Sequence, residues 1–466
     1  MPTRLYSTDP DESWTDHLPH CPNTGIGYAA NVSYRYNGQP THDHVNEDFS
    51  FSFKPDEERD LCLYGVFDGH DGGEKIVNFA AQKITAEIIL DDGLKDNPSD
   101  EQIVSVISQA FRAVEKGYFD SIGDLLAKRA DLQERIHGLN SFEATQQHPE
   151  VVSQLETLNQ QVLGGTTAVV ALQYNGKLYV ANCGDARALL CKVDPDNNQL
   201  HVWQVSTQHD TTNQHEYARL LALGLSDKSV GHFGLPRCTR CLGDFRRKGG
   251  FKEIETFRSA ASEPVISEPD IAGGYFLDGS CRFLILMSGG VYTAWEDATS
   301  SKLANADIAG MVAAEFGSQN SLDAVAQAVV DRIKRVHHDA FMHYDERSPI
   351  CQKLDDMTLL VRNFNQPLPF GGDLHTHVFG GSAQADLAQL TNTQIALDKN
   401  LPMGASAFNT GGLTLQDGQT VSDASSWCID PDDRVSLNLD ENGRIAAYVD
   451  FSEYYEKMNA GSTGDP

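Results

Sequence analysis

Apolar residues recur with two different periods along the first 365 residues. A helical period predicts helices over 76–90, 101–138, 151–162 and 321–341. Apolar runs of strand length lie at 61–67, 283–287 and 357–361, with three more between 164 and 193, and alternating phenylalanines predict a strand around 46–53. Ser321 is expected to cap the last helix. Because helices and strands are grouped rather than alternating, the pattern predicts an α+β sandwich and not a βαβ repeat.

The same pattern divides the chain into regions. Residues 25–365 form the patterned domain, and we expect 1–24 to pack on it. Residues 366–442 are rich in Gly, Ser, Thr, Asn, Asp and Gln with few aliphatic clusters, which predicts a disordered linker. A short patterned segment returns at 443–460.

This C-terminal segment predicts one amphipathic helix. Asp450 and Glu453 have the spacing of a capping box. The apolar side chains that follow at i, i+3, i+4 and i+7 share one face: Phe451, Tyr454, Tyr455 and Met458. Such a helix either docks on its own domain or folds into the groove of a partner, and the predicted linker favours a partner.

Composition narrows the classes of partner. Lys and Arg total 36 and Asp and Glu 66, a formal charge of −30, which argues against nucleic acid and anionic membranes. No apolar run reaches the length of a membrane span and no apolar leader opens the sequence, so we expect a cytoplasmic protein without membrane insertion.

The nine cysteines are irregularly spaced, as in reduced proteins. Cys238 and Cys241 form a C-x-x-C pair, which could indicate zinc or redox chemistry. Without a second pair or flanking histidines, structural cysteines are the favoured interpretation. Histidines in polar stretches, such as His209 and the pair His337-His338, are expected to be exposed.

Six acidic residues lie beside predicted strand ends: Glu47, Asp48, Asp68, Asp185, Asp244 and Asp355. Asp68 ends a buried run and is followed by Gly69 and His70, a combination that suits a hard cation. Any one of these acids could simply mark a turn. Their number and order favour a shared site.

The ordered motifs N-E-D, V-F-D-G-H, G-G-T-T-A, C-G-D-A-R, L-G-D-F, P-V-I-S-E-P-D and D-D-M-T-L resemble the PPM-type family of metal-dependent serine/threonine phosphatases. The resemblance covers about residues 25–365. It implies an α-β-β-α sandwich with a two-metal Mg²⁺ or Mn²⁺ site that activates a bridging water.

The resemblance also implies a role for each acidic residue. Asp68 would bridge both metals, and Glu47 and the Gly69 carbonyl would complete one site. Asp355 would serve the other site, and Asp48 would act behind the ligands or through a water.

Three further residues receive roles in the same way. His70 would be the general acid for the leaving alkoxide. Asp185 and Asp244 fall where the family holds a weaker third metal.

Four positions depart from the family pattern. Ser288 replaces a metal-binding aspartate, and Asp43 replaces the arginine that grips phosphate. Asp71 replaces a glycine and Asp356 an asparagine, so the pocket becomes more negative. We therefore expect an inactive domain that requires no cofactor and holds at most one weakly bound Mg²⁺ or Mn²⁺. A working metal-dependent phosphatase is the alternative.

Several segments, among them LYVANCGDARALLCK, FLILMSGGVY and DDMTLLVRNF, are similar to a non-catalytic adaptor within this family. The similarity implies binding to TGF-beta-activated kinase 1 and activation of that kinase. It also suggests a stress-activated MAP kinase and the BIR domain of the X-linked inhibitor of apoptosis protein as partners. The kinase-binding residues would be Tyr448, Val449, Asp450, Phe451, Tyr454, Tyr455 and Met458.

Overall fold

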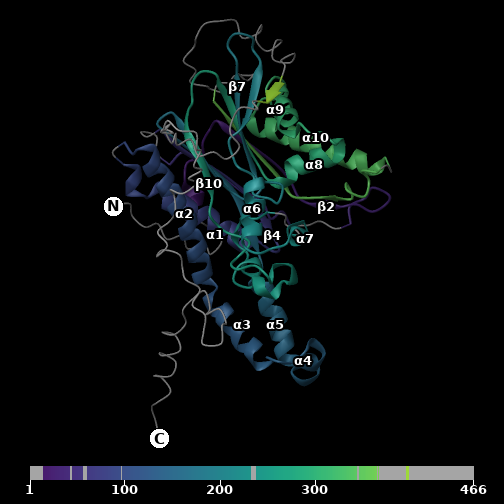
Figure 1. Ribbon diagram of the computed structural model, residues 1–466. Coiled ribbons are helices and arrows are strands. Elements are labelled where there is room, and N and C mark those ends of the chain that lie inside the picture. Colours follow the sequence, from purple (N-terminus) through teal and green to yellow (C-terminus); the bar gives the residue numbers. More distant parts are fainter. Residues whose placement is uncertain are drawn as a thin grey trace, which may run out of the picture. The chain divides into compact units, whose positions relative to one another are not determined.

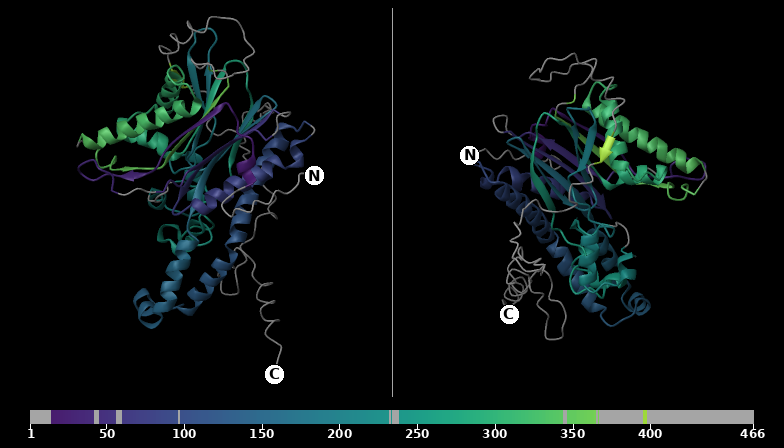
Figure 2. Two further views of the ribbon diagram at one scale, coloured as in Figure 1. Left: turned by 180° about the vertical axis from the view of Figure 1, so that it is seen from behind. Right: turned by 45° about the horizontal axis from the view of Figure 1, so that its top comes forward.

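The computed structural model describes residues 14–41, 45–55, 60–95, 97–231, 233, 238–343, 346–364 and 366, together with the backbone of 395–397. These residues fall into two compact units, one within 1–122 and 160–406 and the other within 123–159. Figures 1 and 2 show the arrangement of helices and strands within each unit.

The larger unit contains two mainly antiparallel sheets. The first has the order β10 (Asp270–Phe276), β6 (Lys177–Cys183), β5 (Gly165–Tyr174), β4 (Leu61–His70) and β3 (Phe49–Phe53), with β9 (Leu242–Gly243) paired to β5. The second has the order β1 (Thr24–Ala29), β13 (Met357–Asn363), β11 (Cys281–Met287), β7 (Arg187–Val193), β8 (Leu200–Gln204) and β14 (Ile395–Leu397). A small third sheet pairs β2 (Val32–Ser33) with β12 (Lys353–Leu354).

Helices pack against both sheets (Figure 2). The helices α1 (Glu74–Ile89) and α2 (Asp100–Ser121) lie against the first sheet, and α8 (Gly289–Thr299), α9 (Ala304–Glu315) and α10 (Leu322–Met342) lie against the second. Between β8 and β10 the chain forms α6 (Gln214–Ala222), α7 (Asp227–Gly231) and the short helices η3 (Phe245–Arg247), η4 (Phe251–Glu253) and η5 (Glu255–Phe257). Two other short helices are η1 (Trp14–His17) and η2 (Asp92–Leu94). The predicted α+β sandwich is confirmed.

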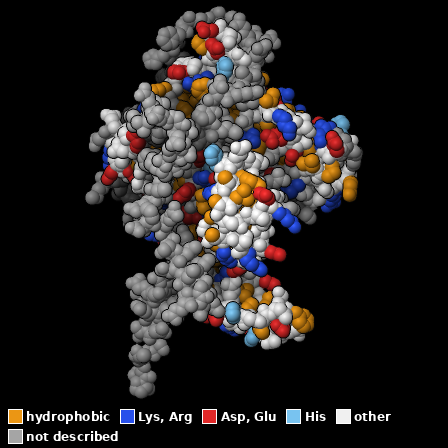
Figure 3. All heavy atoms as spheres, in the orientation of Figure 1, with side chains coloured by type: hydrophobic (Ala, Val, Ile, Leu, Met, Phe, Trp, Pro, Cys, Tyr) orange, Lys and Arg blue, Asp and Glu red, His pale blue; other side chains and the backbone are white. Residues whose placement is uncertain are grey.

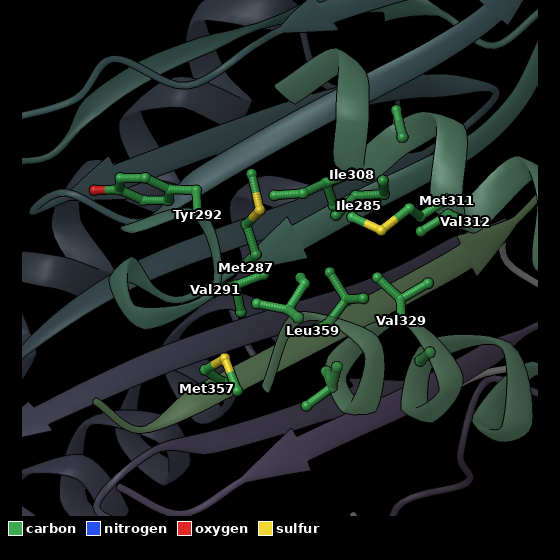
Figure 4. Close-up of a cluster of buried hydrophobic side chains, with 14 of the residues drawn as sticks. Ile285, Met287, Val291, Tyr292, Ile308, Met311, Val312, Val329, Met357 and Leu359 are labelled. Atoms are coloured by element: carbon green, nitrogen blue, oxygen red, sulfur yellow. The ribbon is translucent and has the colours of Figure 1, made fainter. Parts of the chain in front are cut away.

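The second sheet is buried on both faces, and its strands show how. Phe283, Ile285 and Met287 of β11 pack into the cluster formed with α8, α9 and α10, part of which Figure 4 shows. Leu284 and Leu286 of the same strand point to the other side, into the cluster between the two sheets. Successive side chains of a strand alternate between its faces, so one unbroken apolar run fills both cores.

The smaller unit consists of α3 (Gly123–Arg135), α4 (Ser141–Gln147) and most of α5 (Pro149–Gln161). Leu132, Val151 and Leu155 form its small apolar cluster. Arg129 donates from Nε to Oδ1 of Asn159 at 2.7 Å, which joins the first and last helix.

Several expectations need correction. The single helix predicted over 101–138 is interrupted at Ile122, and its second half belongs to the smaller unit. β3 begins only at Phe49, so the acidic pair before it lies outside the strand. Residues 395–397, within the predicted linker, pair in parallel with β8.

Two histidines expected at the surface are buried. His337 is 1% exposed because it lies on the inner face of α10, one turn after Ile333. His209 is fully buried because its backbone N–H bonds to the carbonyl of Gly184 at 2.8 Å, which draws it into the fold. Both histidines have polar neighbours in the sequence, so the sequence pattern does not predict that they are buried.

On the face shown in Figure 3, acidic and basic side chains of the described residues are interspersed, and the hydrophobic side chains form small separate groups. No helix in the described ranges combines the length and the apolar character that crossing a membrane requires.

The contact between β1 and α10 gives a test of this packing. A Cβ atom on Gly27 would lie 2.4 Å from the carbonyl carbon of Ala326, so Gly27→Ala must push the strand and the helix apart. We expect a loss of about 1–3 kcal/mol in the free energy of unfolding, measured by chemical denaturation. Gly279→Ala is the control, because its Cβ would meet no atom within 4 Å. Equal midpoints for the two variants would contradict the close packing.

Candidate functional site

The site is organised around the end of β4. The residues from Leu61 to Phe67 are buried because α1 covers one face of β4 and the second sheet covers the other. Asp68 and His70 continue the strand opposite Thr167 and Gly165. The buried strand therefore places a carboxylate and an imidazole at its end.

The turn after β4 has an unusual backbone. Asp71 has φ 55° and Gly72 has φ 79°, both in the left-handed region. Aspartate tolerates this region better than most residues, so its presence where the family pattern has glycine is compatible with the turn.

The amino end of α8 meets Asp68. The backbone N–H of Gly289 donates to Oδ2 of Asp68 at 3.2 Å. A Cβ atom on Gly289 would lie 3.4 Å from that oxygen and 3.2 Å from Oδ2 of Asp185. Asp68 and Asp185 thus approach the same glycine, where the partial positive charge of the helix end stabilises negative charge.

The pKa shifts of these acidic residues show that they are buried and interact with one another. Burial raises the pKa of Asp68 well above its usual range, and the charges of Asp48 and Asp185 raise it further. Burial also raises the pKa of Asp48 to about 7, with contributions from Asp356 and Asp355. Burial likewise raises the pKa of Asp185. Raised pKa values mean that protons or a cation would stabilise the cluster.

Asp48 has the most exceptional environment of the group. Both of its carboxylate oxygens are buried, and neither meets the geometry of a hydrogen bond with the described residues. The Ser288 and Thr358 hydroxyls nevertheless lie close enough to lower the pKa of Asp48, and burial outweighs them. A proton or a cation would therefore stabilise this carboxylate.

Ser288 ends β11 and lies just before α8. Its side chain is fully buried. Its Oγ accepts the N–H of Thr358 at 2.9 Å, and its N–H donates to the carbonyl of Thr358 at 3.0 Å. The hydroxyl thus joins β11 to β13, and being neutral it adds no charge that could balance a dication.

These residues fit one hard cation better than two. The carboxylates of Asp48 and Asp68 offer oxygen atoms of the kind that Mg²⁺ and Mn²⁺ prefer, and burial raises the pKa of both, so a cation would stabilise them. Ser288 weakens the second position. A bound ion would polarise a water or a phosphoryl oxygen at this edge of the sheet.

Asp356 has a structural role that the family comparison does not suggest. Its Oδ1 accepts the N–H of Asn31 at 2.7 Å, and its Oδ2 accepts Nδ2 of Asn31 at 3.0 Å and the N–H of Glu47 at 3.2 Å. The carbonyl of Glu47 is held so close to Gly69 that a Cβ there would lie 2.6 Å from it. An asparagine offers one acceptor oxygen where Asp356 uses two.

Asp244 and His70 belong to a different set of contacts. Oδ1 of Asp244 accepts the backbone N–H of Arg247 at 3.1 Å, and its Oδ2 pairs with the guanidinium of the same residue. Nε2 of His70 lies 3.4 Å from that Oδ2. The carboxylate of Asp244, which the sequence groups with Asp185, thus faces Arg247 and His70.

The pKa shifts agree with these contacts. Burial opposes ionisation of Asp244, but the hydrogen bond to His70 and the charge of Arg247 hold its pKa well below the usual range. Burial lowers the pKa of His70, and its interactions with Asp244 and Cys241 more than reverse this, to about 9.

Two further residues border the cluster without a sequence signal. Tyr292 of α8 donates from its hydroxyl to the carbonyl of Asp185 at 3.1 Å. The guanidinium of Arg187 lies 3.4 Å from the centre of the Tyr292 ring and donates to Asn305 at 2.9 Å and to Glu296 at 3.3 Å. Arg187 is thereby engaged within the fold.

Some predicted site residues lie outside the described residues. Asp43 is one of them, and the seven expected kinase-binding residues between 448 and 458 are the others.

Comparison with known proteins gives the family. The family model "Protein phosphatase 2C" matches residues 39–337. The chain is 28% identical over 351 residues to the TGF-beta-activated kinase 1 and MAP3K7-binding protein 1 of Caenorhabditis elegans, covering 75% of this chain and 83% of that protein. It is 29% identical over 241 residues to protein phosphatase 2C 1 of Paramecium tetraurelia, covering 51% and 66%. Among solved structures, a C. elegans sex-determining protein aligns with a TM-score of 0.46 and 13% identity, covering 82% and 68%.

The relatives thus include both phosphatases and a kinase-binding protein. Since the family model spans more than half of the sequence, the chain belongs to the protein phosphatase 2C family.

Proposed function

We propose that this chain is a non-catalytic member of the family, an adaptor that binds TGF-beta-activated kinase 1 through residues 443–460 and promotes its autophosphorylation. The observation that carries the proposal is Ser288, a buried neutral hydroxyl among the carboxylates of the cluster. The folded domain would act as a scaffold.

Inactivity of the domain follows from charge. Two-metal hydrolysis needs carboxylates that balance two dications. Ser288 supplies no charge, and its oxygen already accepts the N–H of Thr358. Asp43 stands where the family pattern has the phosphate-binding arginine, so a phosphate dianion would be repelled.

Kinase binding is supported by the C. elegans relative, whose name describes a kinase-binding protein. The C-terminal pattern supports it independently, because Phe451, Tyr454, Tyr455 and Met458 share one helical face. A stress-activated MAP kinase and the BIR domain of the X-linked inhibitor of apoptosis protein are further proposed partners, and the cytoplasm is the proposed location.

A second function remains a candidate for one reason. The buried carboxylates of Asp48 and Asp68 would suit a bound Mn²⁺, as in a working Mn²⁺-dependent serine/threonine phosphatase. The first experiment separates these two functions.

The purified protein should show no Mn²⁺-dependent hydrolysis of a phosphoserine peptide above the buffer rate, because one metal position lacks its charged ligand. Ser288→Asp combined with Asp43→Arg should restore measurable turnover. Mn²⁺-dependent hydrolysis by the unmodified protein, lost in Asp68→Ala, would favour the phosphatase instead.

Calorimetric titration with Mn²⁺ should show one weakly bound ion per chain, since Asp48 and Asp68 supply one set of hard ligands. Asp68→Asn should abolish this binding. Asp331→Asn, which removes the same charge from the exposed surface of α10, should leave it unchanged. Two fully occupied sites, or no binding at all, would refute the single-site expectation.

Phe451→Ala should weaken binding to the kinase domain about thirtyfold to a thousandfold, because truncating a buried aromatic anchor costs about 2–4 kcal/mol. Surface plasmon resonance measures the affinity, and Glu456→Ala on the opposite helical face is the control. The melting temperature should stay the same in both variants. A destabilisation above about 1 kcal/mol in Phe451→Ala would instead place this segment in the protein's own core.

A further inference from the structure

Four side chains of the kinds that bind zinc converge beside the end of β4. Among the described residues, one set of three His, Cys, Asp or Glu side chains has all its ligand atoms within 4.8 Å of one another, and it consists of His70, Cys241 and Asp244. Cys238 completes the C-x-x-C pair with Cys241. Both cysteines are free thiols and fully buried.

A single positive group lies at the centre of these four side chains. Nη2 of Arg247 is 3.3 Å from Nε2 of His70, 3.5 Å from Sγ of Cys238 and 3.9 Å from Sγ of Cys241. The Nε of Arg247 pairs with Oδ2 of Asp244. Two sulfurs, an imidazole nitrogen and a carboxylate oxygen thus surround one cation.

We propose that Cys238, Cys241 and His70, with Asp244 as the fourth ligand, form a site for a soft divalent cation such as Zn²⁺. The guanidinium of Arg247 occupies the centre of this site when no metal is bound. Two thiolates, one imidazole and one carboxylate match the number and the chemistry of a tetrahedral zinc shell.

Charge balance makes the exchange feasible inside the protein. Zinc brings two positive charges, and forming the ligand set releases two protons. These come either from both thiols or from one thiol and a protonated His70, so the net charge of the buried group does not change. Asp244 has two oxygens, so one can stay with Arg247 while the other binds the metal.

One of the two thiols is already polarised toward this state. The hydrogen bond from Cys238 and the charge of Lys248 lower the pKa of Cys241 well below its usual range, while the same hydrogen bond and burial raise the pKa of Cys238. The Nζ of Lys248 also donates to the carbonyl of Cys241 at 2.8 Å. Metals bind thiolates rather than thiols, so this environment favours binding.

The surrounding fold holds the ligands in place. The N–H of Cys241 donates to the carbonyl of Ile266 at 3.0 Å, and β9, which follows it, pairs with β5. A Cβ on Gly165 would lie 2.5 Å from Nε2 of His70, so only glycine leaves that ring its position. Metal sites of high affinity depend on such preorganisation.

The proposal differs from the interpretation of the C-x-x-C pair as structural, which the sequence favours because no histidine flanks the pair. The fold supplies His70 from a distant strand and Asp244 from three residues beyond Cys241. The site is separate from the proposed kinase-binding function and does not depend on it.

Cobalt is the probe for this site, because its bonds to thiolate absorb light. The reduced, metal-stripped full-length protein should develop thiolate-to-cobalt charge-transfer absorption that saturates at one equivalent of Co²⁺ and disappears on addition of Zn²⁺. The double variant Cys238→Ser/Cys241→Ser should lose this absorption. Cys191→Ala, which removes a buried thiol from β7, should keep it. Arg247→Gln should bind cobalt more tightly, because the competing guanidinium is gone.

X-ray absorption of the zinc-loaded unmodified protein tests the ligands without any variant. We expect two sulfur scatterers at about 2.3 Å and nitrogen or oxygen at about 2.0–2.1 Å. Zinc binding in an unbuffered solution near pH 7 should release two protons per ion. A shell without sulfur, or no charge-transfer absorption in the unmodified protein, would overturn the proposal. So would absorption that persists in the double cysteine variant.

Discussion

The burial of several carboxylates close to one another is the constraint on which the rest of this domain depends. Asp48, Asp68 and Asp185 each have a raised pKa, chiefly because they are buried. Only a rigid frame keeps such groups together, and the two sheets provide it. At the start of α8, the backbone N–H of Gly289 donates a hydrogen bond to Asp68. The rest of the site is arranged around this balance.

The departures from the family pattern fit this balance in different ways. Ser288 lowers the negative charge of the cluster and uses its hydroxyl to join two strands. Asp356 raises the charge, but three N–H groups of Asn31 and Glu47 donate to its two oxygens. One side chain thus joins two strands, whereas the other holds the backbone of Glu47 in place. The architecture of the domain accommodates both changes of charge.

A second group of buried charges stabilises the region after β8. Glu216 accepts from Arg219 at 2.8 Å and from Arg240 at 2.6 Å, and Lys248 pairs with Glu115. Paired in this way, buried charges are tolerated that would be costly alone. These ion pairs hold in place the loop that carries Cys238 and Cys241 beside His70. The cysteine cluster and the carboxylate cluster therefore both lie at the end of β4.

The sequence by itself determined the elements and the family pattern. Alternating and helical periods are local properties, so the strands around 61–67 and 283–287, the cap at Ser321 and the α+β class could be predicted from the sequence. Only the tertiary structure decided which acidic residues lie close together, because the sequence around a strand end does not identify the residues that the fold brings near it. Asp244 meets His70, and His209 is buried against Gly184, through contacts between residues distant in the sequence. The sequence could not identify the neighbours of the C-x-x-C pair either, because His70 lies beside it only through the pairing of β4 and β9 with β5.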